Sequence, residues 1–175
     1  FLILLIILLL AGVLRLYKLG SIPPHLSPDE AAIGYNAYSI LKTGRDEYGK
    51  FMPIIFKSFG DYKPGLYVYT AVPFIATLGL NEFSTRLPGA LSGIASVLVL
   101  YLIIKKLFEK EKLALISAFL LALNPWHIYF SRGAWEISLN LLLTLLGIYF
   151  FVNYKNKYSL MLSNVFYGFS LCNIE

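Results

Sequence analysis

Long, predominantly apolar runs separated by short charged segments constrain this chain more than any other feature of its sequence. The first ten residues carry no polar side chain, and similar runs extend over 87–104, 113–130 and 137–152. Charged residues make up 14% of the 175 residues, whereas an ordinary soluble domain carries about 25%. Runs of this composition are typical of helices that cross a lipid bilayer. We therefore predict an all-α fold, a polytopic transmembrane helical bundle.

The predicted organisation alternates membrane helices with loops. We expect transmembrane helices at residues 1–19, 84–108, 113–130 and 137–153, and the start of a fifth at 158–175. The long loop at 20–83 is expected to hold two interfacial helices, at about 28–42 and 66–80, and a short loop covers 131–137. Because the chain has no starting Met and stops within an apolar stretch, we expect an N-terminal fragment of a larger protein.

The charges of this chain do not indicate a nucleic-acid partner, although the net charge is +5. Basic residues gather at 105–112 and 155–157, next to apolar runs, where they orient helices and contact anionic lipid. The single cysteine, Cys172, excludes a disulfide within the chain.

Two membrane topologies agree with these charges, and they differ in whether residues 66–80 cross the bilayer. If this segment lies in the interface, the loops that carry Asp29 and Glu136 share the outer side, and both basic clusters are cytoplasmic. If the segment crosses, the Asp29 loop becomes cytoplasmic, opposite Glu136. The short length of the segment and its interruption by Pro73 favour the first topology.

Two adjacent carboxylates, Asp29 and Glu30, are the strongest candidates for chemistry. Ser27 is expected to cap a helix that starts at Pro28 and stops at Gly44, with Glu30 completing a Ser-x-x-Glu capping box. The capping box and the helix dipole explain these acidic residues without a catalytic role. Their position just beyond a membrane helix, however, is the depth at which a lipid-anchored substrate presents its headgroup.

Four further residues are candidate substrate contacts. Lys63, between Tyr62 and the rigid Pro64, offers a fixed positive charge for a phosphate group. Arg132 and Glu136 belong to the short loop before the fourth predicted membrane helix. Each of these charges also has a plain structural interpretation, as a residue at the membrane interface.

A divalent metal is the one cofactor that the residues leave open. Asp29 and Glu136 are its first candidate ligands, with Glu30, His25 and His127 in addition. No spacing typical of metal ligands supports such a site, so the sequence indicates no cofactor with certainty.

Several short motifs resemble, in order, the first loop and the following helices of C-type membrane glycosyltransferases. They are the runs at 27–37, 41–46, 52–53, 61–67, 86–88, 124–125 and 131–132. The similarity covers nearly the whole chain. It is greatest to the lipid A aminoarabinose transferases and the bacterial mannosyltransferase-like proteins, and more distant to the protein O-mannosyltransferases. This chain has Glu136 where relatives often have Asp, and Gly65 where a second Pro is common.

The resemblance implies roles for individual residues. Asp29 corresponds to the first-loop acidic residue that acts as general base or orients the acceptor, with Glu30 as its neighbour. Lys63 corresponds to the lysine that contacts the donor phosphate, and Glu136 to a second acidic residue after the third membrane helix. The enzyme is then a glycosyltransferase that moves a hexose or pentose, with inversion, from a polyprenyl-phosphate donor of the undecaprenyl type.

The implied acceptor is a cell-envelope component such as lipopolysaccharide, polysaccharide or protein. The implied location is the plasma membrane, with the active site on its non-cytoplasmic face, membrane lipids as further partners and no nucleic acid. From the residues alone, a membrane transporter component and a non-catalytic membrane-assembly subunit stay open as alternatives. Transporters usually place ionisable groups near the bilayer midplane and contain repeats, whereas the charges here cluster outside the apolar runs.

Overall fold

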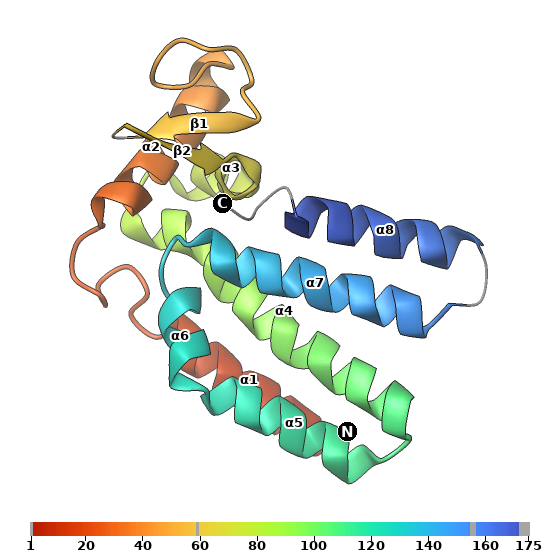
Figure 1. Cartoon of the computed structure of the whole chain (residues 1–175). Helices are drawn as coiled ribbons and strands as arrows, with labels where there is room; N and C mark the ends of the chain where they lie inside the picture. Colours follow the sequence, from red (N-terminus) through yellow and green to blue (C-terminus); the bar gives the residue numbers. More distant parts are fainter. Residues whose placement is uncertain (1, 59, 155–156, 172–175) are drawn as a thin grey trace.

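The computed structural model describes residues 2–58, 60–154 and 157–171, and most of them are helical. The elements are α1 (Leu2–Leu16), α2 (Pro28–Thr43), β1 (Ile55–Ser58), β2 (Asp61–Pro64), α3 (Leu66–Leu78), α4 (Glu82–Phe108), α5 (Glu111–Leu123), α6 (Pro125–Ser131), α7 (Glu136–Val152) and α8 (Lys157–Leu171). In Figure 1, α2, α3 and the strands gather at one end of a bundle that contains α1, α4, α5, α7 and α8. We call residues 28–78 the cap.

The expectation of a mostly helical chain is confirmed, but the all-α prediction is wrong at residues 55–64. The strands β1 and β2 form an antiparallel hairpin in which Phe56 lies opposite Lys63. Burial alternates along β1, with Phe56 and Ser58 inside, because successive side chains of a strand point to opposite faces. At the turn, Gly60 adopts a φ of 92°, a conformation that favours glycine.

Helix α2 begins and ends as the sequence predicts. The Glu30 amide donates to Ser27 Oγ over 3.3 Å, and the Ser27 amide donates to Glu30 Oε2 over 3.0 Å, which completes the capping box. Pro28 is the first helical residue, and Gly44 ends the helix with a φ of 69°. These caps fix the direction of the first turn, from which Asp29 and Glu30 project.

Small residues allow the bundle helices to approach closely. Helix α5 packs on α1 and α4 through Ala114, Ala118 and Ala122, which are fully buried. Gly89 and Gly93 of α4 also lie at a close contact. A Cβ atom at Gly93 would lie 2.5 Å from the Cβ of Ser131, and one at Gly89 would lie 2.7 Å from the Gly133 carbonyl oxygen. Helix α4 therefore lies directly against α6 and the loop that follows it.

The apolar helices differ in how far they extend. Among the described residues, α4 is long and apolar enough to cross a membrane alone, whereas α5 and α6 meet that criterion only as a pair bent by 60°. The straight helix expected at 113–130 is broken at Pro125, which lacks an amide hydrogen and obstructs the preceding turn. Helices α1, α3 and α7 are apolar but shorter. Residues 172–175 of the expected fifth membrane helix lie outside the described residues.

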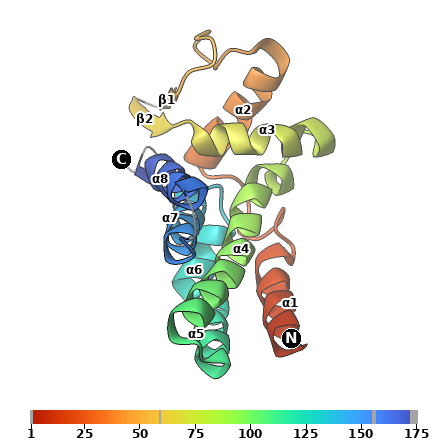
Figure 2. The same cartoon turned by 90° about the vertical axis from the view of Figure 1, so that its right-hand side faces the viewer.

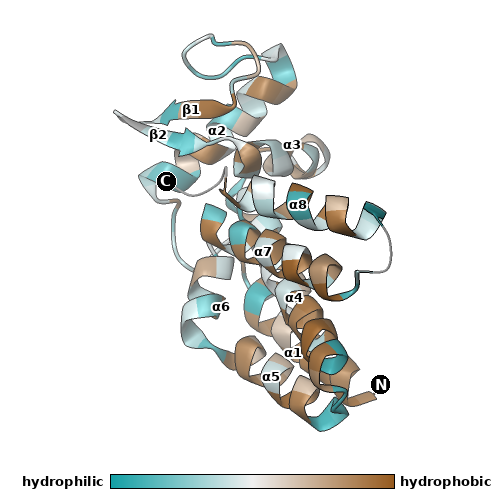
Figure 3. Cartoon of the chain, turned by 45° about the vertical axis from the view of Figure 1, so that its right-hand side comes forward, coloured by the Kyte–Doolittle hydropathy of each residue, from teal (hydrophilic) through white to brown (hydrophobic). Residues whose placement is uncertain are grey.

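The loops fall at two opposite ends of the bundle. The start of α1 and the turn between α4 and α5 lie far from the cap, whereas the α6–α7 loop lies on the cap side (Figure 1). Figure 2 shows that α3 lies across the end of α4 rather than beside it. Apolar residues run along α1, α4, α5 and α7, and polar residues mark the α4–α5 turn and much of the cap (Figure 3).

Candidate active site

Asp29 and Lys63 form an ion pair at the surface of the cap. The Lys63 Nζ lies 3.4 Å from Asp29 Oδ1, and 38% of the Asp29 side chain is exposed, against 14% of the Lys63 side chain. The first turn of α2 presents the carboxylate, and β2 presents the ammonium. The hairpin holds Lys63 in place because its strand partner, Phe56, is buried. The structure thus brings together the two residues that the sequence analysis assigned to acceptor and donor.

Glu30 points into the protein and binds Arg86 of α4. Its Oε1 accepts hydrogen bonds from Arg86 Nε at 2.8 Å and from the Ala134 amide at 3.0 Å. Its Oε2 accepts from Arg86 Nη2 at 3.1 Å and from the Ser27 amide. Burial by itself raises the pKa of Glu30, but these hydrogen bonds outweigh it and hold that pKa below its usual value. Glu30 therefore stays a carboxylate and joins three segments of the chain.

Arg86 extends this junction to the segment between α1 and α2. Its Nη1 donates to the carbonyl oxygens of Leu19 and Pro23, and its Nη2 donates to that of His25. The side chain is fully buried. Arg86 falls within the short motif at 86–88, and no role was predicted for it. A lone arginine near the start of a long apolar helix was the available signal, since such a residue needs partners inside the protein.

Arg132, predicted as a substrate contact, donates hydrogen bonds to backbone carbonyls. Its Nη1 donates to the carbonyl oxygens of Leu14 and Arg15, at 2.9 and 3.2 Å. Its Nη2 donates to those of Tyr17 and Ile22. These are the open carbonyls at and beyond the end of α1, which a cation near a helix C-terminus stabilises.

Two further predicted site residues are Glu136 and Tyr62. Glu136 is the first residue of α7, two positions after Ala134, and its Oε1 is buried. Glu136 and Glu30 both act electrostatically on the buried Tyr67 of α3. Tyr62 of β2, by contrast, is largely exposed. Its ring neighbours Lys63 in sequence, on the opposite face of the strand.

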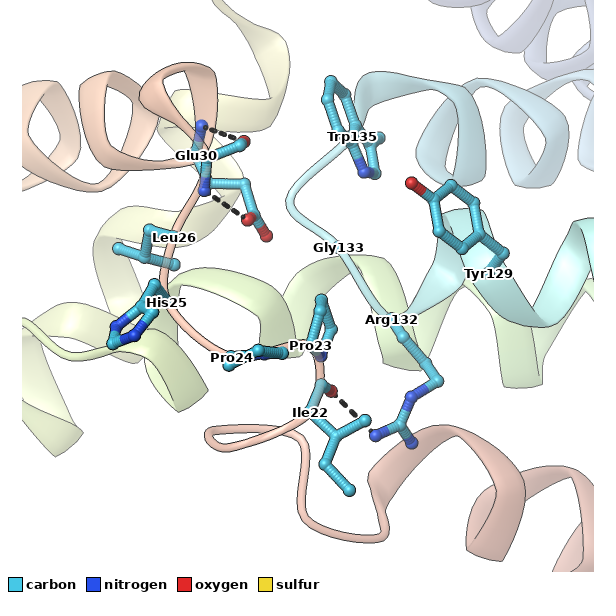
Figure 4. A pocket seen from close by; sticks show the side chains of 11 residues that line it. Ile22, Pro23, Pro24, His25, Leu26, Glu30, Tyr129, Arg132, Gly133 and Trp135 are labelled. Atoms are coloured by element: carbon cyan, nitrogen blue, oxygen red, sulfur yellow. Dashed lines mark hydrogen bonds between the residues drawn. The ribbon is translucent and has the colours of Figure 1, made fainter.

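A cavity of about 420 Å³ opens beside Glu30. Figure 4 shows Trp135 and Tyr129 on one side of it and Pro24, His25 and Leu26 on the other. The remaining lining residues are Ile22, Pro23, Ser27, Glu30, Arg132 and Gly133. Neither Asp29 nor Lys63 lines the cavity, so it adjoins the junction around Glu30 rather than the ion pair itself.

No cluster of three or more potential metal ligands occurs in the part of the chain that the structure describes. Asp29 pairs with Lys63, and His127 Nδ1 lies 2.7 Å from Arg15 Nη2. The geometry offers no further support for the divalent metal that the sequence left open.

Comparison with known proteins gives one match. A family model described as dolichyl-phosphate-mannose-protein mannosyltransferase matches residues 5–171. No curated protein and no solved structure matches the chain. The matched range contains the cap, the ion pair and the junction around Glu30.

Proposed function

Because this chain belongs to the dolichyl-phosphate-mannose-protein mannosyltransferase family, we propose that Asp29 and Lys63 form the catalytic centre of a membrane glycosyltransferase. The family supports a donor in which a sugar is linked to a polyprenyl phosphate. The observation that carries the proposal is the meeting of a carboxylate and an ammonium from separate elements, at an accessible surface. Neither Asp29 nor Lys63 takes part in the internal hydrogen bonds of Glu30 and Arg86.

The proposed reaction is a single displacement at the anomeric carbon of the donor. An acceptor hydroxyl oxygen forms the new bond to this carbon while Asp29 takes its proton. The bond from the carbon to the phosphate oxygen breaks, and the lipid phosphate leaves with the electron pair. A positioned base of this kind contributes about 10²–10⁴-fold to the rate. Lys63 offsets the negative charge that grows on the leaving phosphate.

Glu30 has a different proposed role, since its four hydrogen bonds leave it no free position for a substrate proton. It orients the first turn of α2 and so aims Asp29 at the surface. Glu136 and Tyr62 remain proposed substrate contacts, supported by their nearness to the junction and to Lys63. Arg132 is proposed to hold the end of α1 rather than the substrate, because its hydrogen bonds go to backbone carbonyls.

The acceptor is proposed to be a hydroxyl-bearing component of the cell envelope, such as a protein, a polysaccharide or lipopolysaccharide. The transferred group is a hexose or pentose, and a single displacement inverts its configuration. We place the reaction on the non-cytoplasmic face of the plasma membrane. Two observations support this side: the cap and the α6–α7 loop share one end of the bundle, and the basic residues at 105–112 occupy the other.

The catalytic role is tested by Asp29→Asn in the full-length enzyme, with a polyprenyl-phosphate sugar as donor. We expect normal insertion and folding but a loss of transfer of about 10²–10⁴-fold. Glu82→Gln is the matched control, because it also removes an acidic residue from the first turn of a helix. Equal transfer by both variants would reduce Asp29 to a residue that complements the helix dipole.

The membrane side is tested with single cysteines in a background without Cys172. Ile54, which is 82% exposed, samples the cap, and the exposed Lys110 samples the opposite end. A membrane-impermeant thiol reagent on intact cells should label a cysteine at position 54 and miss one at position 110. The reverse pattern would place the cap in the cytoplasm and reject the proposed side.

A further inference from the structure

The break between α5 and α6 leaves backbone carbonyls without their helical partners. Pro125 has no amide hydrogen, so the carbonyl of Leu121 lacks the bond that a continuous helix would supply and accepts instead from the Asn124 amide at 3.3 Å. The Ala122 carbonyl belongs to the same last turn, where such groups are open. Inside an apolar bundle, an open carbonyl is costly because no water replaces the lost donor.

Arg15 of α1 supplies donors at this break. Its Nη1 donates to the Ala122 carbonyl at 3.2 Å, and its Nη2 donates to that of Leu121 at 3.4 Å. Its Nη1 also donates to the Ala11 carbonyl within α1, at 3.2 Å. The side chain is fully buried, so this cation has its hydrogen-bond partners inside the protein.

His127 of α6 completes the contact. Its Nδ1 lies 2.7 Å from Arg15 Nη2, and the residue is 2% exposed. A guanidinium can only donate, so Nδ1 is the acceptor and the imidazole is neutral with its proton on Nε2. Arg15 thereby binds both sides of the break. It donates to backbone carbonyls at the end of α5 and to the His127 imidazole at the start of α6.

A second arginine joins the other end of α6 to α1. Arg132 follows that helix and donates to the carbonyls of Leu14 and Arg15 at the end of α1. The two arginines therefore bind α6 to α1 at both ends of α6. Two residues beyond Arg132, the Ala134 amide donates to Glu30.

We propose that Arg15 is a positioning residue that sets the direction of α6 and thereby holds the Ala134 amide on Glu30. This inference rests on the proposed function in one step only: a well-placed Glu30 keeps its neighbour Asp29 in position for catalysis. The chain of contacts runs from Arg15 and His127 through α6 to Ala134, Glu30 and the first turn of α2. Arg15 itself is buried and touches no substrate.

The test uses the full-length enzyme with Arg15→Met and Arg15→Lys, and measures amide hydrogen exchange in the peptide that contains Ala134. In Arg15→Met we expect exchange there to quicken by about tenfold or more, the factor for one lost hydrogen bond of ordinary strength. In the same variant, kcat should fall by about tenfold while KM for the donor stays within about twofold. Arg15→Lys should be almost as impaired, because a single ammonium cannot reach the same set of acceptors.

A second pair of variants covers the case in which Arg15→Met does not fold. His127→Asn keeps an acceptor near the Nδ1 position and should retain slow exchange and most of kcat, whereas His127→Leu should lose both. Lys18→Met, at the exposed end of the same segment, is the control and should match the wild type.

The outcomes separate the positioning role from a merely structural one. A positioning role is rejected if Arg15→Met and His127→Leu lower the yield or unfolding temperature but leave Ala134 exchange and the kcat of the folded fraction unchanged. Exchange requires no turnover, so it also separates this inference from the proposed function. If exchange quickens in Arg15→Met while Asp29→Asn stays active, the positioning contact stands and the catalytic assignment falls.

Discussion

Two ion pairs start from neighbouring residues of α2 and lead to opposite surroundings. Asp29 meets Lys63 of the nearby hairpin at 3.4 Å, with more than a third of its side chain exposed. Glu30 meets Arg86 of α4 at 2.8 Å, and both side chains are almost completely buried. Consecutive residues of a helix point about 100° apart, so one carboxylate faces the surface of the cap and the other the interior.

This contrast shows that adjacency in sequence does not imply a shared role. The buried pair is bound by a fixed set of donors and cannot exchange them for a substrate without leaving charges uncompensated. The Asp29–Lys63 pair is longer and more exposed on its Asp29 side, so a ligand that brings its own phosphate and hydroxyl groups can open it. Substitutions in either pair distinguish a structural pair from a reactive pair.

The largest effect is expected from breaking the buried pair. Arg86→Met leaves the Glu30 carboxylate without its main partner and should lower the free energy of unfolding by about 3–5 kcal/mol. Thermal unfolding of the purified protein in detergent measures this change. The double variant Glu30→Gln/Arg86→Met should recover part of it, since no lone charge remains buried. A change below about 1 kcal/mol in Arg86→Met would contradict a structural role for this pair.

Breaking the exposed pair should change binding rather than stability. Lys63→Met should alter the free energy of unfolding by less than about 1 kcal/mol. Its affinity for the polyprenyl-phosphate donor should fall by about 10- to 100-fold, the range for a lost hydrogen bond to a charged group. Lys50→Met, in the same loop region, serves as the control. Unchanged donor binding in Lys63→Met would remove this lysine from the proposed centre.

The pH dependence of stability should come from the buried pair. The pKa of Glu30 is lowered in the folded state from a reference value of 4.5. A carboxyl with a lowered folded pKa stabilises the protein above its unfolded pKa, and this contribution is lost as the pH falls through the folded pKa. Between about pH 7 and pH 5 the contribution should be constant, and it should fade below about pH 4.5. Glu30→Gln should lack this component of acid unfolding.

The smallest effect is expected at a third pair, between Lys105 and Glu111 at the opposite end of the bundle. Its atoms lie 2.9 Å apart, closer than those of Asp29 and Lys63, but about half of each side chain is exposed. Lys105→Met should therefore leave the unfolding temperature and sugar transfer unchanged within error. A marked loss of activity would show that distance from the cap does not separate functional from incidental charges.

Local signals were enough to predict the parts of the site that depend on nearby residues. The capping box of Ser27 and Glu30 and the stop of the helix at Gly44 are both confirmed. The resemblance to membrane glycosyltransferases is confirmed by the matching family model. Each of these rests on short-range patterns or on the order of motifs.

The contacts that join distant segments were not predictable in the same way. Arg86 binds a carboxylate 56 positions away, and Arg15 binds carbonyls more than a hundred positions away. Nothing in the local sequence specifies such partners. The hairpin was missed because its strands are only four residues long and contain a turn-like, charged stretch. The roles of Asp29, Lys63, Tyr62 and Glu136 stay predictions.

The buried alanines of α5 have a consequence for how the bundle holds together. Between helices in lipid, water does not drive association as it does between helices in solution. An alanine side chain has no rotamers to lose, so Ala114, Ala118 and Ala122 meet α1 and α4 without giving up any side-chain conformational freedom. A leucine at these positions would lose rotamer freedom and would also hold the helices further apart. The contact of α5 with α1 and α4 thus gains van der Waals interactions with almost no loss of side-chain entropy.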